Sequence, residues 1–199
     1  MIIDRNEVLR YLGYRRGRTE VTPEVEALLA EAEERARALA RPQGVWTTLE
    51  VASASPEAIR LQGVDLAVTG RRTVEFFAGA RRLTVLVVTI GPALEEEVAE
   101  LFRRGEWARA TALDAAGSEA ADELAAQVEE LVRQEAAGAG YEITPRFSPG
   151  YSDWSLSAQA PLVAAAGGER IGVRVNEAFL LIPRKSVSAA IGWRPLNSK

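Results

Sequence analysis

The chain has 199 residues, of which 47% are hydrophobic and 26% are charged, and its formal net charge is -4. This composition is ordinary for a globular protein with a packed core, and the acidic balance argues against nucleic acid as a partner. Cysteine and histidine are both absent. Disulfides, cysteine-based metal sites and a Ser-His-Asp triad are therefore excluded, and acid–base chemistry is left to Asp, Glu, Lys or Tyr. These exclusions favour a binding protein over a hydrolase.

The sequence carries no sign of secretion or of membrane insertion. Its N-terminus lacks the apolar segment of a signal peptide, and the longest apolar run, 83–90, is too short to span a bilayer. We therefore expect a cytoplasmic protein that has no membrane partner.

Helical patterns dominate the first 42 residues. A short helix is predicted over 4–13, and Thr22-Pro23 opens a second helix that ends at 41–44. We expect this N-terminal helical part, about 1–42, to form one domain over 1–199 together with a mixed α/β remainder.

Strand patterns fill the region from 45 to 90. Short strands are predicted over 47–51, 59–61 and 66–68. The run over 83–90 is β-rich and nearly all apolar, which is typical of a strand buried on both faces.

The second half of the chain mixes both patterns. Helices are predicted over 93–104, about 107–136 and 158–166, and strands over 170–175, 179–182 and 186–191. Within the long helix, Ala-Ala-Gly-Ser at 115–118 is small enough for close approach by another backbone or a ligand. Because helices and strands are clustered instead of alternating, we predict an α+β fold with a mainly antiparallel sheet and helices packed around it.

The most informative segment is the stretch 144–156. Pro149-Gly150 favours a tight turn in which the glycine takes a positive φ. Arg146 can present a planar fork to a carboxylate, and Tyr151 and Trp154 offer aromatic faces to a base or a sulfonium. This combination suits a small zwitterionic ligand with an aromatic part, although a structural loop with one buried arginine would have a similar sequence.

This segment also resembles a known family. The residues 146–154 read RFSPGYSDW and resemble the Arg-x-x-x-Gly-Tyr loop of the activation domain of cobalamin-dependent methionine synthase. The stretch 171–192, IGVRVNEAFLLIPRKSVSAAIG, is similar to the closing segment of that family, and 113–132, LDAAGSEAADELAAQVEELV, resembles its long helix. The segments VLRYLGYR and VVTIGPALEEEV look like parts of small stand-alone members of the family.

The resemblance implies a module that binds S-adenosylmethionine and acts in trans. It would dock on the cobalamin-binding part of methionine synthase, or on another corrinoid protein, and support reductive methylation of cob(II)alamin, with flavodoxin or another reductase as electron donor. The module would contribute to methionine biosynthesis without turnover of its own. The alternative is a non-catalytic docking protein for a corrinoid methyltransferase, with a degenerate S-adenosylmethionine site. An independent methyltransferase is disfavoured, because no general base and no Gly-rich dinucleotide fingerprint is evident.

Matching this sequence to the family motif residue by residue implies five cofactor-binding residues. It implies no catalytic residue and no metal ligand. Arg146 would hold the ligand's carboxylate, Ser148 would supply main-chain contacts, and Gly150 would permit close approach. Tyr151 would line the site. Glu119 matches a helix glutamate that contacts the ligand in the family, although an ordinary exposed helix carboxylate is the alternative.

Two features depart from the family pattern. Where the large enzymes carry a Trp-Tyr pair after Ser-Val-Ser, this sequence has Ala190 and Ile191, which supports the degenerate-site alternative. Lys185 is an additional cation in the turn before that motif. We interpret it as a solvated surface residue, with a contact to a corrinoid side chain or to an acidic partner surface as the alternative.

Overall fold

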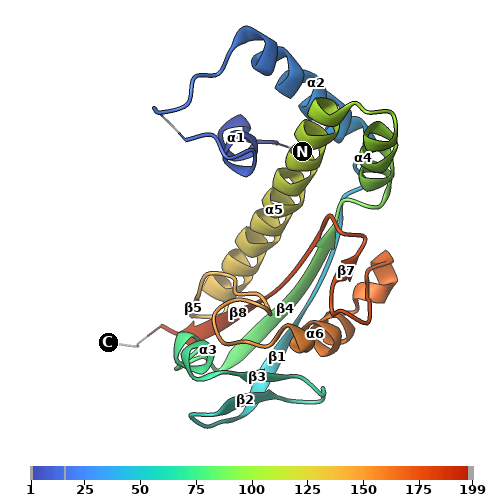
Figure 1. The fold of residues 1–199 in the computed structure, drawn as a ribbon. Coiled ribbons are helices and arrows are strands. Elements are labelled where there is room, and N and C mark those ends of the chain that lie inside the picture. Colours follow the sequence, from blue (N-terminus) through green and yellow to red (C-terminus); the bar gives the residue numbers. More distant parts are fainter. Residues whose placement is uncertain (1, 16, 197–199) are drawn as a thin grey trace.

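The computed structural model describes residues 2–15 and 17–196, in which helices pack around an antiparallel sheet (Figure 1). The helices are α1 (Arg5–Tyr11), α2 (Pro23–Leu39), α3 (Arg71–Phe76), α4 (Ala93–Arg103), α5 (Trp107–Gly138) and α6 (Gln159–Ala166). The strands are β1 (Gln43–Ala54), β2 (Ala58–Leu61), β3 (Ala67–Thr69), β4 (Arg82–Thr89), β5 (Tyr141–Ile143), β6 (Arg174–Val175), β7 (Leu181–Ile182) and β8 (Ser186–Pro195).

The large sheet of the described chain has six strands in the order β3-β2-β1-β4-β8-β5, and every neighbouring pair is antiparallel. β4 lies between β1 and β8, and its side chains from Leu83 to Thr89 are all buried. The sequence-based prediction of a strand buried on both faces is therefore confirmed, even though its neighbours run antiparallel to it.

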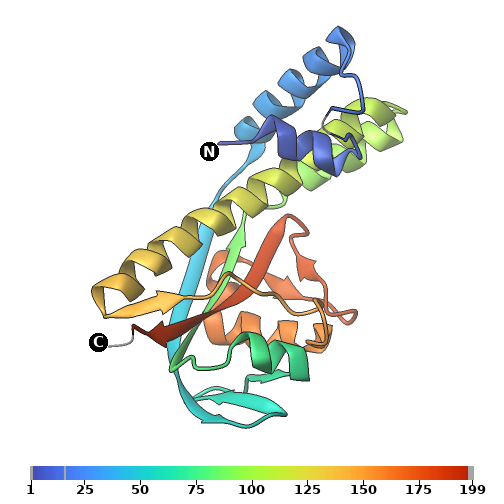
Figure 2. The ribbon, with the colours of Figure 1, turned by 90° about the vertical axis from the view of Figure 1, so that its left-hand side faces the viewer.

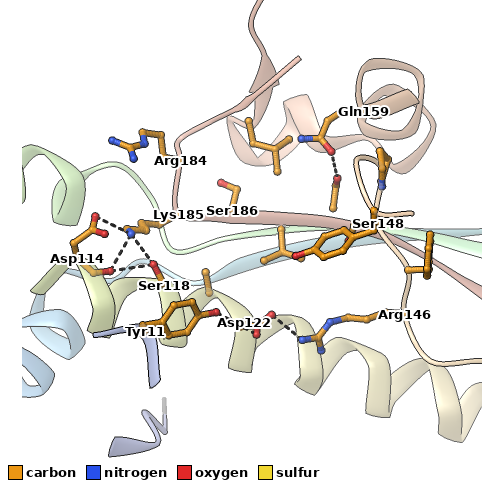
Figure 3. Close-up of a pocket in the computed structure, with 17 residues that line it drawn as sticks. Tyr11, Asp114, Ser118, Asp122, Arg146, Ser148, Gln159, Arg184, Lys185 and Ser186 are labelled. Atoms are coloured by element: carbon orange, nitrogen blue, oxygen red, sulfur yellow. Dashed lines mark hydrogen bonds and ion pairs between the residues drawn. The ribbon is translucent and has the colours of Figure 1, made fainter. Parts of the chain in front are cut away.

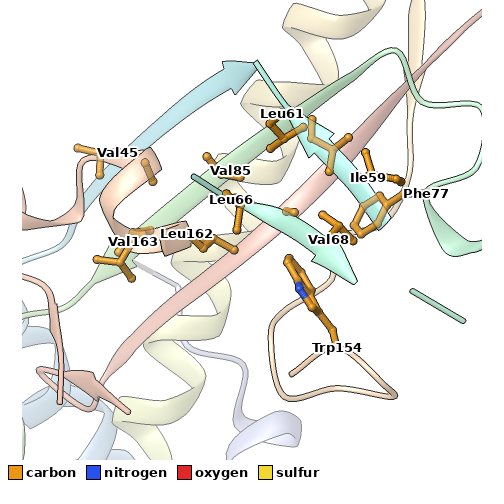
Figure 4. Packing of buried hydrophobic residues seen from close by; sticks show 14 of the residues in the cluster. Val45, Ile59, Leu61, Leu66, Val68, Phe77, Val85, Trp154, Leu162 and Val163 are labelled. Atoms are coloured by element: carbon orange, nitrogen blue, oxygen red, sulfur yellow. The ribbon is translucent and has the colours of Figure 1, made fainter. Parts of the chain in front are cut away.

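Helices cover both faces of this sheet, as Figure 2 shows: α5 crosses one face, and α3 and α6 lie against the other. Because side chains alternate along a strand, Leu86 and Val88 pack beneath α5. Leu83, Val85 and Val87 belong to the core on the opposite face. Figure 4 shows this second core, in which side chains from β2, α6 and the loop before α6 meet those of β4.

A third core joins α1, α2 and α4 to the first half of α5 (Figure 1). The side chain of Leu94 on α4 packs closely against α5 at Gly117, where an added Cβ would lie 2.5 Å from Cδ2 of Leu94. The small segment 115–118 therefore admits the side chain of a neighbouring helix, whereas the sequence had suggested a backbone or a ligand.

The predicted α+β class, antiparallel sheet and long helix over about 107–136 are confirmed, and the long helix extends over Trp107–Gly138. The strand predicted over 170–175 is wrong in its first part. There the chain forms a 3-10 helix over Gly168–Ile171, Gly172 then takes a φ of +74°, and only Arg174–Val175 is extended. No helix within the described residues combines the length and the apolar character needed to cross a bilayer.

Candidate functional site

An open pocket of about 680 Å³ lies where α5, the 146–151 loop, the start of α6 and the start of β8 meet (Figure 3). Tyr11, at the end of α1, also lines it, although α1 is far away in the sequence. Arg146, Ser148 and Tyr151, three of the residues predicted for the site, are among its lining residues.

The tight turn predicted from Pro149-Gly150 is confirmed. The N–H of Tyr151 donates to the carbonyl of Ser148 at 3.3 Å, and Gly150 has a φ of +89°. Proline at the second position and glycine with positive φ at the third are the signature of a type II turn. Gly150 itself does not line the pocket, and its role in this conformation is to allow the turn that presents Ser148 and Tyr151.

The core anchors both sides of this loop. Phe147 exchanges backbone hydrogen bonds of 2.9 and 2.8 Å with Ala190 of β8. Trp154 is buried and packs against Phe147 and Phe77, so its interpretation as an exposed face for the ligand is wrong. Asp153 accepts hydrogen bonds from the backbone N–H groups of Arg72 and Thr73 at the start of α3, which lower the pKa of its carboxyl.

Arg146 faces α5 and already has acidic partners there. Its Nη2 lies 2.7 Å from Oδ1 of Asp122, and its Nη1 lies 3.4 Å from Oε2 of Glu129. A guanidinium has five N–H donors, so these two contacts leave donors free for a further acceptor. The other carboxylate oxygen of Asp122 accepts a 3.5 Å hydrogen bond from the Tyr11 hydroxyl.

Lys185 lies at the opposite end of the pocket, and only 8% of its side chain is exposed. Its Nζ lies 2.8 Å from Oδ1 of Asp114 and donates to the Asp114 carbonyl and to the Ser118 hydroxyl. The interpretation of Lys185 as a solvated surface residue is therefore wrong. The cause is strand register: the Lys185 carbonyl accepts from Ile90 N–H at the end of β4, and this places the side chain against α5.

Two further polar groups complete the walls. Arg184 is exposed, and its guanidinium forms no ion pair with any residue of the described chain. On the other side, the Ser188 hydroxyl donates to Oε1 of Gln159 at 2.9 Å, and both side chains are buried. The pocket thus has cations at both ends, carboxylates beside them and hydroxyl groups between.

Glu119 does not line this pocket. It is 5% exposed, on the side of α5 that α1 covers, so the alternative of an exposed helix carboxylate is wrong. Burial, and to a lesser extent the nearby carboxylates of Glu7, Asp122 and Asp4, raises its pKa to about 7, while a hydrogen bond with the Asp4 backbone acts in the opposite direction. In this conformation α1 separates Glu119 from the pocket.

Ala190 and Ile191 also lie outside the pocket, because both are fully buried within β8. Aromatic residues at these two positions would have to fit into the packed core, so the alanine and isoleucine found here are consistent with the fold.

Sequence reasoning missed most of the lining residues, including Tyr11, Asp114, Asp122 and Gln159. One signal was available: 114, 118 and 122 are spaced four residues apart, so they share one face of a helix. Nothing in the sequence indicated that this face would meet the start of β8.

The charge arrangement determines what can bind. Adjacent positive and negative groups, such as Arg146 and Asp122, complement the carboxylate and ammonium of an amino acid. The residues that the structure describes contain no cluster of acidic side chains suited to a metal ion.

No family model and no curated protein matches the sequence. Among solved structures, the MetH reactivation domain bound to AdoHcy (S-adenosylhomocysteine) is similar to this chain, with a TM-score of 0.75 and 18% sequence identity. The similarity covers 99% of this chain and 75% of that chain. At this identity the likeness establishes the fold: the chain has the fold of the MetH reactivation domain, as the sequence resemblance had predicted.

Proposed function

We propose that this protein binds S-adenosylmethionine in the pocket between α5 and β8, and that it supports reductive methylation of cob(II)alamin carried by methionine synthase. The observation that carries the proposal is the meeting of Arg146, Ser148 and Tyr151 in one pocket of a chain with this fold. The cobalamin, the electron donor (flavodoxin or another reductase) and action in trans are parts of the proposal that come from the sequence resemblance.

The pocket's charges suit the amino-acid end of this ligand. Arg146 would donate its free N–H groups to the carboxylate, and Asp122, 2.7 Å from that guanidinium, would accept from the ammonium. Binding would thus extend an ion pair that already exists, so neither protein charge would lose its partner.

The remaining lining groups would position the rest of the ligand. Ser148 would offer its main chain at the turn, and the exposed ring of Tyr151 would cover the sulfonium or the base. Gly150 would act through the turn, and Glu119 would reach the ligand only if α1 moved away. The ligand supplies the methyl group, and the protein's part is to bind it, orient it and limit its contact with water.

Isothermal titration of S-adenosylmethionine and AdoHcy tests the binding step. Arg146→Ala should weaken binding of both ligands by at least about tenfold, because a charge-assisted pair is lost. Arg71→Ala is the matched control, since that arginine is exposed on α3 and pairs with Glu75. Absence of binding to the wild type, or equal affinity for wild type and Arg146→Ala, would contradict the proposal.

The reactivation step needs a separate assay. The protein is added as a separate chain to a cob(II)alamin-loaded methionine synthase that lacks an activation domain, with S-adenosylmethionine and a reductant. We expect methylation of the cobalamin, followed by absorbance, to depend on this protein and to be reduced by Arg146→Ala.

A docking role without a methyl donor is the second candidate, and one observation favours it: Arg146 already pairs with two carboxylates of α5, so its charge is balanced without a ligand. Capture of a cobalamin-domain protein, combined with no heat of binding for S-adenosylmethionine or AdoHcy, would support this role over the first.

A further inference from the structure

Only one of the two polar atoms of the Gln159 side-chain amide has a hydrogen-bond partner among the described residues. Its side chain is on the first residue of α6, the residue is 8% exposed, and it lines the pocket. Its Oε1 accepts from Ser188, whereas its Nε2 has no hydrogen-bond partner among residues 2–15 and 17–196. Figure 3 shows the amide nitrogen of Gln159 on the side away from the dashed hydrogen bond that its oxygen accepts. Because Gln159 lines the pocket and this donor is not used within the protein, the group is placed to meet a ligand.

The backbone N–H and C=O groups of Ser188 also face the pocket. Ala190 exchanges both of its backbone hydrogen bonds with Phe147, on the side of β8 that faces away from β4. Backbone groups of an antiparallel strand alternate in direction, so those of Ser188, two residues away, face the same side. β5 pairs with β8 only at 193–195, and the loop diverges after Phe147. Within the described chain the outer edge of β8 at Ser188 is therefore unpaired and opens into the pocket.

Together these groups form a short hydrogen-bonding row with fixed directions. It consists of the Nε2 and Oε1 of Gln159 beside the backbone N–H and C=O of Ser188, and the Ser188 hydroxyl holds the amide in place. Leu181 and Phe147, also at the pocket wall, add apolar surface next to it. Such a row suits the edge of a planar heterocycle that carries donors and acceptors side by side.

We propose that Gln159 is the specificity residue for the base of the ligand, and that it recognises the 6-amino edge of adenine. An amide can donate to a purine ring nitrogen while accepting from the exocyclic amino group, a pairing that glutamine and adenine make in other complexes. A 6-oxo purine places an acceptor opposite Oε1 and loses this pairing. The inference rests on the proposed function, which supplies an adenosyl ligand. Ser188 is the positioning residue, because it acts through Gln159.

The test compares two ligands that differ only at position 6 of the base, AdoHcy and S-inosylhomocysteine, by isothermal titration. The wild type should bind AdoHcy roughly 10-fold to 100-fold more tightly, as a bidentate base contact typically provides. Gln159→Leu should weaken AdoHcy binding and bring the ratio of the two affinities close to one. Ser188→Ala should reduce the same ratio by a smaller factor, since the amide stays but is held less firmly.

Gln127→Leu is the matched control, because that glutamine is exposed on α5 and does not line the pocket. Unfolding curves for each variant separate loss of the fold from loss of recognition, and the affinity ratio is insensitive to a uniform loss of binding-competent protein. If Gln159→Leu keeps the wild-type ratio, the inference is overturned while the proposed function stands. If the wild type binds neither ligand, the proposed function fails and the inference fails with it.

Discussion

The ammonium of Lys185 lies 2.8 Å from Oδ1 of Asp114, and it also donates to the Asp114 carbonyl and to the Ser118 hydroxyl. Two of its N–H donors form hydrogen bonds, and the Asp114 carboxylate balances its charge. These contacts join the residue before β8 to the middle of α5, two elements that form opposite walls of the pocket. The pair therefore holds the pocket in shape as well as giving it charge.

This geometry predicts an asymmetry between two substitutions. Asp114→Ala leaves a largely buried ammonium without its counter-ion and should cost about 2–3 kcal/mol of unfolding free energy. Lys185→Met keeps most of the side-chain packing and leaves a carboxylate that water can reach, so it should cost about 1 kcal/mol or less. Urea unfolding measures both. Equal costs, or a larger cost for Lys185→Met, would contradict this account of the pair.

A second prediction concerns the turn in the 146–151 loop. Gly150→Ala places a methyl group on a residue with a φ of +89° and brings it to 3.0 Å from Cδ1 of Leu156. We expect a loss of about 1–2 kcal/mol in stability from the backbone strain, together with weaker AdoHcy binding, because the turn presents Ser148 and Tyr151.

The matched control for this substitution is Gly63→Ala. Gly63 has a φ of +78°, and an added Cβ would have no heavy atom within 4 Å. It should show a similar strain cost in urea unfolding but unchanged AdoHcy affinity in titration. If both variants lost AdoHcy affinity, the weaker binding of Gly150→Ala could not be attributed to a change in the 146–151 loop.

Local patterns were sufficient to predict much of the fold. The Leu83–Thr89 run, the proline that opens α2 and the Pro149-Gly150 turn depend on nearest-neighbour chemistry, so their sequences indicate their structures. The site was harder to predict, because it depends on contacts between distant segments. Lys185 looked like a surface cation until strand register placed it against α5, and Trp154 looked like a ligand face until its ring was found in the core.

Glu119 shows a different limit of sequence reasoning. Its place on α5 was clear from helical spacing. Which face of α5 is covered by α1, however, depends on packing between two helices that are distant in the sequence. The sequence resemblance implied that Glu119 contacts the ligand. The structure places Glu119 beneath α1, near Asp4 and Glu7.

A third prediction concerns the contact between α4 and α5. In Gly117→Ala the new Cβ would lie 2.5 Å from Cδ2 of Leu94, inside a packed core. Overpacking of this kind costs about 1–3 kcal/mol. The extra cost should shrink in a Leu94→Ala background, where the methyl group has room, and a double-mutant cycle by urea unfolding measures that coupling.

Gly138→Ala is the control for this cycle, because Gly138 belongs to the same helix and an added Cβ there meets no atom within 4 Å. It should be neutral or slightly stabilising, since alanine favours the helix. Strictly additive effects of Gly117→Ala and Leu94→Ala would contradict the proposed contact.

The last prediction is a pH dependence that comes from Glu119. Burial raises its pKa to about 7 in the folded chain, from an ordinary value of 4.5. Between these pH values the folded state holds a proton that the unfolded state releases, so this group lowers stability as pH rises from about 4.5 to about 7. Above that range its penalty is constant. Asp4, Glu7 and Asp122 face the same carboxyl, and their negative charges add to the penalty.

Glu119→Gln keeps an acceptor for the Asp4 backbone and removes the ionisation. The variant should match the wild type near pH 4 and exceed its unfolding free energy by on the order of 1–2 kcal/mol at pH 8. Urea unfolding at a series of pH values measures the difference, and Glu135→Gln, an exposed carboxylate on the same helix, should show little pH dependence. A difference that stays flat from pH 5 to pH 8 would mean that Glu119 does not ionise with a raised pKa beneath α1. A difference that grows would also predict that α1 is held least firmly in alkaline solution, where the charged carboxylate favours exposure to water.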